Sequence, residues 1–352
     1  MPVKYPTVLH LYPALPSLLL ASTLILTAVS SIAGPLAGCS DPLAANYEPA
    51  AERNDGSCVY PITTHAPSFV FELPDEVHET SGLLFFDTRL WTFNDSSGEP
   101  VLYAIDRTNG TVTQRVRLNN VRNHDWEDIA SDDTYLYVGD FGNNDGTRTN
   151  LAVYKVPLAA LPKKGDAEVE AEIIRFRYPD QVSFAPSRTH NFDCEAMIAA
   201  GNFLYLFSKN RGDGRTNLYR IPKKPGNWIA EQQGHFNSAG LVTGADYNTT
   251  HNEVILTGYM RVRKEYLPFL WLLFDFEGHD FLKGNKRRIE LIDTKASQIE
   301  GVTYITGRDV VLSAEAGTSV KAMAYRLNTA IWTDPEGGKG NKMKGATPPV
   351  LP

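Results

Sequence analysis

Two adjoining segments decide the fold: NHDWEDIA at residues 123–130 and YLYVGDFGNN at residues 135–144. Acidic residues open the first apolar segment, an Asp-rich turn follows, and the second, strongly apolar segment ends at Gly139 and Asp140. Short segments rich in β-branched and aromatic residues, separated by turn residues, are typical of β-strands. The stretch therefore predicts a pair of strands whose first member starts at an acidic residue.

The same unit recurs along the chain. Each copy opens with an acidic or hydroxyl residue, often beside Gly or Ala, and continues with a second and a third apolar strand. The opening positions are Ser81, Glu127, Glu195, Gly244 and Glu300. Neighbouring openers are separated by 46 residues (81 to 127) to 68 residues (127 to 195). Repeats of about this length with several strands each are the sequence signature of a β-propeller.

The predicted fold is an all-β, five-bladed propeller at residues 68–332. Outer, fourth strands are expected at residues 113–118, 171–176, 228–232 and 286–291. The fifth unit has no fourth strand of its own, so the strand at 68–73 is expected to complete it, which closes the ring without a free edge. A six-bladed propeller is the alternative, but its extra blade would have to come from the 127–195 interval, which contains a single strand opener.

The remaining segments bound the protein's location. Residues 18–33 carry no charge, which suits the apolar region of a signal peptide and is short for a spanning helix. We therefore expect a signal peptide at 1–38, an exported monomer that is secreted or on the outer surface, a linker at 61–67 and a disordered tail at 333–352. The net charge of −7 disfavours nucleic acid as a partner.

The three cysteines are Cys39, Cys58 and Cys194. Cys39 follows Leu-Ala-Gly, which resembles the lipobox of bacterial lipoproteins, where the cysteine is acylated. Residues 39–60 instead resemble a small module of secreted and surface proteins, especially of Bacteroidetes, whose two cysteines pair. The module matches more positions than the lipobox, so we favour a Cys39–Cys58 disulfide over a lipid anchor at Cys39. Cys194 is expected to be a buried free thiol.

Four motifs carry a resemblance for the rest of the chain: WEDIA at 126–130, GDFGNN at 139–144, NFDCEA at 191–196 and GNKRR at 284–288. With these, residues 68–328 resemble a family of uncharacterised exported bacterial β-propellers of the Bacteroidetes type. More distantly, the blade layout is similar to the calcium-activated nucleotidases of the apyrase family. Those propellers hold Ca²⁺ in a central channel with acidic and hydroxyl groups from the inner strands. The resemblance implies Ca²⁺ as cofactor and Ser81, Glu127, Glu195 and Glu300 as its ligands, while Gly244 departs from the hydroxyl expected at its place.

Charge alone supports a cation at the same place. Glu127, Glu195 and Glu300 head innermost strands, which converge on the axis. Like charges held close together are costly unless they are protonated or bind a cation, and Ca²⁺ takes about six to eight oxygen ligands in flexible geometry. The alternative is that the carboxylates face channel water or bond backbone amides of neighbouring blades. No His or Cys cluster has the spacing of a zinc site.

The loops supply candidate ligand-binding residues. These are Asn94, Asp95, Asp140, Asn143, Lys209, Arg211 and Arg261. Such a mixture suits an anionic group bound near calcium, or else consists of turn formers and solvated charges. His124 and Asp125 are the candidate catalytic residues, with His124 as a general base. Because second strands run away from the openers, their ends and the openers need not share a face.

These observations predict an exported, calcium-binding β-propeller that binds a small-molecule, glycan or protein ligand. It would contact the membrane only through a lipid anchor at Cys39. The alternative is a calcium-dependent hydrolase of phosphate or ester bonds, similar to apyrases or phytases.

Overall fold

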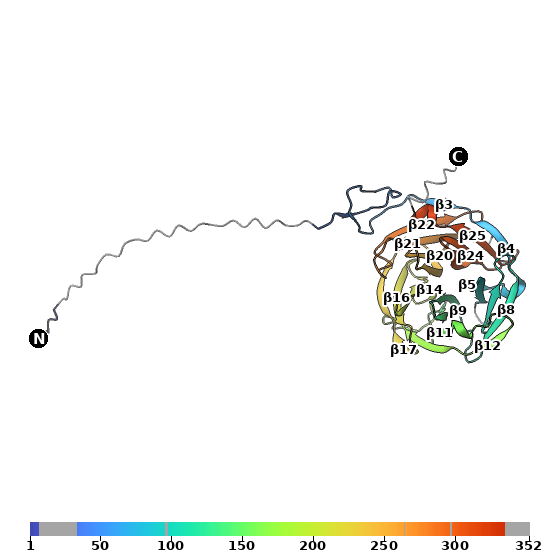
Figure 1. The fold of residues 1–352 in the computed structure, drawn as a ribbon. Helices are drawn as coiled ribbons and strands as arrows, with labels where there is room; N and C mark the ends of the chain where they lie inside the picture. The colour runs from blue at the N-terminus through green and yellow to red at the C-terminus, as the bar shows by residue number, and fades with distance from the viewer. Residues whose placement is uncertain (7–33, 96–97, 264, 296–297, 335–352) are drawn as a thin grey trace. The chain divides into compact units, whose positions relative to one another are not determined.

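The computed structural model describes residues 1–6, 34–95, 98–263, 265–295 and 298–334. The chain divides into two units, Met1–Gly34 and Pro35–Pro352, and the second contains five sheets of four or five strands around a central axis (Figure 1). The five-bladed propeller is therefore confirmed. The apolar run at 18–33 and residues 335–352 of the predicted tail lie outside the described residues. In the part that the structure describes, no helix is long and apolar enough to cross a membrane.

Each blade is an antiparallel meander whose first strand lines the axis. Blade 1 contains β5 (Thr80–Phe86), β6 (Arg89–Asn94), β7 (Val101–Ile105) and β8 (Val112–Leu118). Blade 2 contains β9 (Trp126–Ser131), β10 (Tyr135–Asp140), β11 (Ala152–Pro157) and β13 (Glu172–Arg177). Blade 3 contains β14 (Cys194–Ala200), β15 (Phe203–Ser208), β16 (Thr216–Pro222) and β18 (Glu231–Phe236).

Blades 4 and 5 complete the ring. Blade 4 contains β19 (Leu241–Asn248), β20 (Glu253–Val262), β21 (Glu265–Phe274) and β22 (Asn285–Leu291). Blade 5 contains β23 (Ile299–Thr306), β24 (Asp309–Ala314), β25 (Met323–Asn328) and the early strand β4 (Ser68–Glu72). As expected, β4 pairs antiparallel with β25. The first and last parts of the propeller thus share one sheet, which removes two free edges.

Three short strands extend the outer edges in parallel. β12 (Ala167–Val169) joins blade 1, β17 (Gly226–Ile229) joins blade 2, and β3 (Thr63–His65), within the predicted linker, joins blade 4. In Figure 1, β12, β17 and β3 lie at the rim of the ring, whereas β5, β9 and β14 lie near its centre.

The outer strand of blade 3 differs from the prediction at 228–232. That segment is divided: β17 pairs with β13 of the preceding blade, and β18 forms the outer strand of blade 3. The division falls at Ala230, which is buried and whose backbone N–H donates to the Arg177 carbonyl at 3.0 Å. The hydrophobic pattern cannot place this division, because the apolar signal comes from Trp228, Ile229 and Ala230, whereas β18 is mostly polar.

Apolar side chains fill the spaces between neighbouring blades. One cluster joins Trp91 and Phe93 of blade 1 to Trp126 and Tyr154 of blade 2. The rings of Phe93 and Trp126 meet edge to face with centroids 5.4 Å apart, an arrangement that adds about 0.5–1.5 kcal/mol to the burial of the two rings. This packing fixes the positions of the inner strands around the axis.

The predicted disulfide is confirmed. Cys39 and Cys58 are bonded, with their Cα atoms 4.7 Å apart, in a small module that also contains the parallel pair β1 (Ala37–Gly38) and β2 (Arg53–Asn54). A lipid anchor on Cys39 would exclude this bond. Cys194 is a free, fully buried thiol, as expected, and burial raises its pKa.

Candidate cation site in the central channel

A β-bulge displaces the glutamate that opens an inner strand in three blades. In blade 2 the strand pairing steps from Trp126 to Asp128 and skips Glu127. The pairing skips Glu195 in blade 3 and Glu300 in blade 5 in the same way. A bulge re-aims a side chain away from the regular alternation of the strand. The three glutamates therefore leave their strands by the same device, at equivalent places.

Blade 4 corrects the alignment of the openers. Its pairing skips Thr243, so the residue equivalent to the three glutamates is Thr243, and the alignment of Gly244 is wrong by one position. The Thr243 hydroxyl donates to the Ile299 carbonyl of blade 5 at 2.7 Å. The Ser81 hydroxyl likewise donates to the Glu127 carbonyl of blade 2 at 2.7 Å. The two hydroxyl openers thus tie neighbouring blades together.

The ends of the second strands lie beside the openers, contrary to the expectation that they might lie on another face. An antiparallel partner returns to the level at which the first strand began. In blade 1, Thr80 lies opposite Asn94, the last residue of β6, so Asp95 comes directly after the strand at the openers' level. Lys209 follows β15 and Glu315 follows β24 in the same way.

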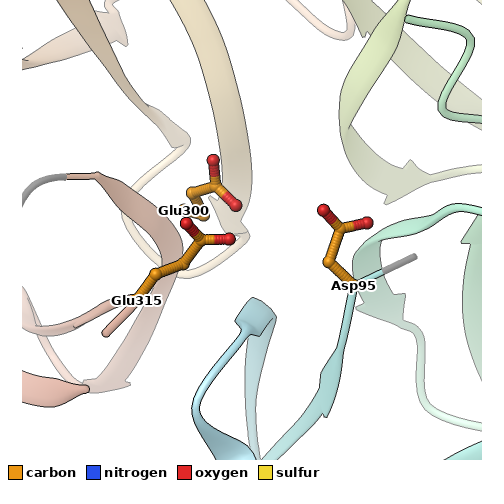
Figure 2. A group of neighbouring side chains, drawn as sticks. All are labelled: Asp95, Glu300 and Glu315. Atoms are coloured by element: carbon orange, nitrogen blue, oxygen red, sulfur yellow. The ribbon is translucent and has the colours of Figure 1, made fainter. Parts of the chain in front are cut away.

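Seven carboxylates consequently gather around the channel. They form three overlapping groups, each with ligand oxygens within 4.8 Å of one another: Asp95, Asp125 and Glu127; Asp95, Glu300 and Glu315; and Glu127, Asp193 and Glu195. In Figure 2, Asp95 of blade 1 faces Glu300 and Glu315 of blade 5. The structure thus brings three of the four predicted metal ligands into one connected cluster, together with Asp95 and Asp125.

The third group carries its own cations. The Lys209 ammonium bonds the Glu195 carboxylate, and Lys209 is only 3 % exposed. Arg211 donates to Asp193 at 2.7 Å and lies 3.6 Å from Glu195. Burial raises the pKa of Glu195 to about 7, an effect that Lys209 partly offsets. This part of the channel, Asp193 and Glu195 with Lys209 and Arg211, is called the paired arc below.

The first of the three groups, in contrast, has no cation bonded to it in the described part of the chain. Asp95, Asp125 and Glu127 form no ion pair with any Lys, Arg or His in the described part of the chain. Glu127 is 2 % exposed and its Oε1 has no hydrogen-bond partner there, and the same holds for Oδ1 of Asp95. We call these three residues the open arc. Buried polar atoms in folded proteins usually have a partner, and a bound cation would supply one to these two carboxylate oxygens.

The three carboxyl groups of the open arc have raised pKa values. Burial, and then the neighbouring carboxylates, raise the pKa of Glu127 well above its usual range. The same causes raise the pKa of Asp95 to about 8 and that of Asp125 to about 6. A bound cation would reverse this cost, because it favours the charged carboxylates.

Gly142 accounts for part of the GDFGNN motif. A Cβ atom at this position would lie 2.0 Å from Glu127 Oε1 and 2.4 Å from Asp125 Oδ2. Only glycine leaves room for both carboxylates. The backbone N–H of Gly142 also donates to the Asp125 carbonyl at 3.2 Å. The motif therefore leaves the space that two carboxylates of the open arc occupy.

The donor set fits a hard cation. Its side-chain ligands are carboxylate oxygens from the end of β6 and the start of β9, with neither His nor Cys among them, which suits Ca²⁺ and not Zn²⁺.

Several predicted ligand-binding residues instead form hydrogen bonds that fix the loops around the channel. Asp140 is fully buried and accepts hydrogen bonds from Arg148 at 2.7 Å and from the Tyr154 hydroxyl at 2.6 Å. The amides of Asn94 and Asn143 donate to backbone carbonyls at 2.8 Å and 3.0 Å. These contacts position the loops around the channel.

Two other predicted residues lie apart from the cluster's ion pairs. Arg261 is exposed near the end of β20, where its guanidinium lies 5.7 Å from the Tyr266 ring centroid. His124 bonds Asp140 through Nδ1 at 2.9 Å and does not contact the open arc through any described hydrogen bond.

Asp193 and Glu315 were not predicted as ligands. Asp193 stands two residues before Glu195, as Asp125 stands two residues before Glu127. Glu315 directly follows a second strand, as Asp95 does. Reading these repeated offsets blade by blade would have identified both residues.

Comparisons with known proteins add little beyond the architecture. No protein-family model matches the chain, and no curated protein matches it significantly. Solved structures that are similar in part include an exo-β-1,3-galactanase from Phanerochaete chrysosporium (10 % identity, TM-score 0.47, 75 % of this chain and 64 % of that chain). A GH43 β-1,3-galactosidase has 9 % identity and a TM-score of 0.42 over 75 % of this chain and 94 % of that chain. A chain of the mitotic checkpoint complex has 12 % identity and a TM-score of 0.32 over 70 % and 61 %. The chain thus spans less than two thirds of the first and the last of these, and similarities at these TM-scores assign no activity to it.

Proposed function

We propose that this chain is an exported bacterial propeller that binds Ca²⁺ in its central channel and binds a ligand or partner at the same face. The observation that carries the proposal is the Glu127 carboxylate, which is buried among acidic neighbours with Oε1 unpartnered. The cost of holding such a charge is several kcal/mol. A divalent cation shared by Glu127, Asp95 and Asp125 would remove it.

Calcium titration of the purified protein tests the proposal. Isothermal titration calorimetry after chelator treatment should show Ca²⁺ binding to the wild-type protein and none, or far weaker binding, to Glu127→Gln. Glu170→Gln is the matched control, because Glu170 is an exposed carboxylate with no described partner. Equal Ca²⁺ binding by the two variants would refute the channel site.

A calcium-dependent hydrolase of phosphate or ester bonds is the second candidate. Asp125 favours it, since this carboxyl belongs to the open arc, is 9 % exposed and has a pKa raised to about 6 by burial and neighbouring acids. A carboxyl that titrates near neutral pH is suited to general acid–base catalysis.

A hydrolysis screen separates the two candidates. Nucleotides, phosphomonoesters and carboxylic esters would be assayed with Ca²⁺ and with chelator, using wild-type protein, Glu127→Gln and Asp125→Asn. Turnover that chelator and both substitutions abolish would establish the hydrolase. Calcium binding without turnover of any substrate class would leave the binding protein.

A further inference from the structure

A cavity lies against blade 2 and the segment that joins blade 1 to blade 2. Its volume is about 400 Å³, and its polar lining comes from the segment after β8 and from β11, β13 and their flanks. The polar lining residues are Arg122, His124, Arg175, Tyr154 and the asparagines 119, 120 and 150. Among the described residues, no carboxylate lines this cavity. In a chain with a net charge of −7, a cavity with three basic residues and no acid is a local reversal of charge.

A buried network fixes the histidine. His124 Nδ1 lies 2.9 Å from Oδ2 of Asp140, which is fully buried. Asp140 is held in turn by Arg148 at 2.7 Å and by the Tyr154 hydroxyl at 2.6 Å. A carboxylate on Nδ1 sets the tautomer and the orientation of an imidazole. Nε2 is the ring nitrogen left to meet a ligand, and the His124 side chain is 44 % exposed.

The backbone of Arg122 is also fixed. Its carbonyl accepts a hydrogen bond from the Trp126 indole at 3.1 Å. The Tyr154 hydroxyl, which donates to Asp140, lies 3.3 Å from the same carbonyl. Arg175 lies on β13 opposite Ala152 of β11, next to the same tyrosine. Neither guanidinium forms an ion pair or a hydrogen bond within the described residues. Both arginines therefore offer their full donor sets to a ligand.

The cations of the channel contrast with these. Lys209 and Arg211, which the sequence suggested for binding an anion, are committed to Glu195 and Asp193. An anion would have to compete with those carboxylates for the two cations, whereas Arg122 and Arg175 have no described partner to displace. Guanidinium groups bind carboxylate, phosphate and sulfate through paired N–H donors.

We propose that this cavity binds an oxyanion, with Arg122 and Arg175 as its charged donors and His124 Nε2 as a third polar contact. The ligand would be a carboxylate, phosphate or sulfate group, either free or carried by a larger molecule. The site does not depend on calcium, because none of its lining residues belongs to the open arc.

Anion titrations in the presence of chelator test this site. Inorganic phosphate, sulfate and acetate would each be titrated while the midpoint of thermal unfolding is followed, since a ligand of the folded state raises it. We expect at least one of the three to stabilise the wild-type protein and to identify the preferred chemistry. Arg122→Gln and Arg175→Gln should each weaken its binding by about tenfold or more. Arg188→Gln is the control, because Arg188 is 82 % exposed and away from the cavity.

Chemical labelling provides a readout on the unmodified sequence. Phenylglyoxal reacts with accessible arginines, and mass spectrometry would locate the labelled residues. The preferred anion should protect Arg122 and Arg175 and leave Arg188 unprotected. The proposal is overturned if no anion binds, if the cavity variants bind as well as the control, or if Arg211→Gln alone abolishes binding.

Discussion

Both arcs of the channel contain buried acidic residues, but only the paired arc bonds them to Lys and Arg side chains. In the paired arc, Glu195 is buried but bonds the Lys209 ammonium, and Asp193 bonds Arg211. In the open arc, Glu127 is equally buried, forms no ion pair within the described residues, and has its pKa raised by burial and by neighbouring carboxylates. The difference shows that burial of acid alone does not define a cation site. We propose the cation site where the described part of the chain supplies no cation of its own.

The largest effect is expected in the paired arc. Replacing Lys209 with methionine leaves Glu195 buried without its partner, which should lower the free energy of unfolding by about 3–5 kcal/mol. Denaturant titration measures this loss. Lys223→Met is the matched control, because Lys223 pairs with the less buried Asp132 at 2.9 Å and should cost about 1 kcal/mol. Equal losses in the two variants would contradict the distinction between the arcs.

The next effect concerns the wall of the open arc. Gly142→Ala would place a methyl group against Glu127 and Asp125, and should cost about 1–3 kcal/mol of stability while weakening Ca²⁺ binding. Gly98→Ala serves as control, since its Cβ would meet no atom closer than 3.5 Å. Calorimetry and thermal unfolding would be run on both. Unchanged calcium affinity in Gly142→Ala would separate this glycine from the site.

Removing the unpaired charge of Glu127 should raise the free energy of unfolding, whereas removing Lys209 should lower it. In chelator at pH 8, Glu127→Gln is expected to stabilise the protein by about 1 kcal/mol, because it deletes a carboxylate whose ionisation burial opposes. The gain should disappear at low pH, where the wild-type carboxyl is protonated. Destabilisation of the chelated protein by this substitution would mean that Glu127 has a stabilising partner.

The smallest expected effect is a dependence of the chelated protein's stability on pH. Raised folded-state pKa values of about 6 for Asp125, 7 for Glu195 and 8 for Asp95 mean that the folded protein holds protons longer than the unfolded chain. Stability is therefore present at low pH and falls as pH rises from about 5 to about 8. The unfolding midpoint of chelated protein should drop by a few degrees over this range, and Ca²⁺ should restore it at pH 8. A midpoint that rises with pH in chelator would contradict these shifts.

Much of the fold is readable from the sequence because each blade repeats the same strand grammar. The openers Glu127, Glu195 and Glu300 and the closing strand at residues 68–73 were predicted on that basis. The divided segment at 226–236 was not, because the partner of a strand depends on contacts between blades. The apolar residues Trp228 and Ile229 precede Ala230, whereas β18 after it is mostly polar, so the apolar pattern does not mark the outer strand of blade 3.

The site was predicted in part. The sequence predicted three glutamates at the channel. It did not predict the pairing of Lys209 with Glu195, because that contact depends on the register of two strands. The bulges that select Thr243 over Gly244 also leave no mark in composition. The shared level of Asp95 and Glu315 with the openers follows from antiparallel pairing, and the sequence was sufficient for that step.

A crystal structure grown with Mn²⁺ or Tb³⁺ in place of Ca²⁺ tests the central claim most directly, because anomalous scattering locates the ion. The account predicts a peak in the open arc, coordinated by Glu127 Oε1, Asp95 Oδ1 and Asp125, with Lys209 still bonded to Glu195. A peak in the paired arc that displaces Lys209, or a channel without any ion at saturating metal, would contradict it.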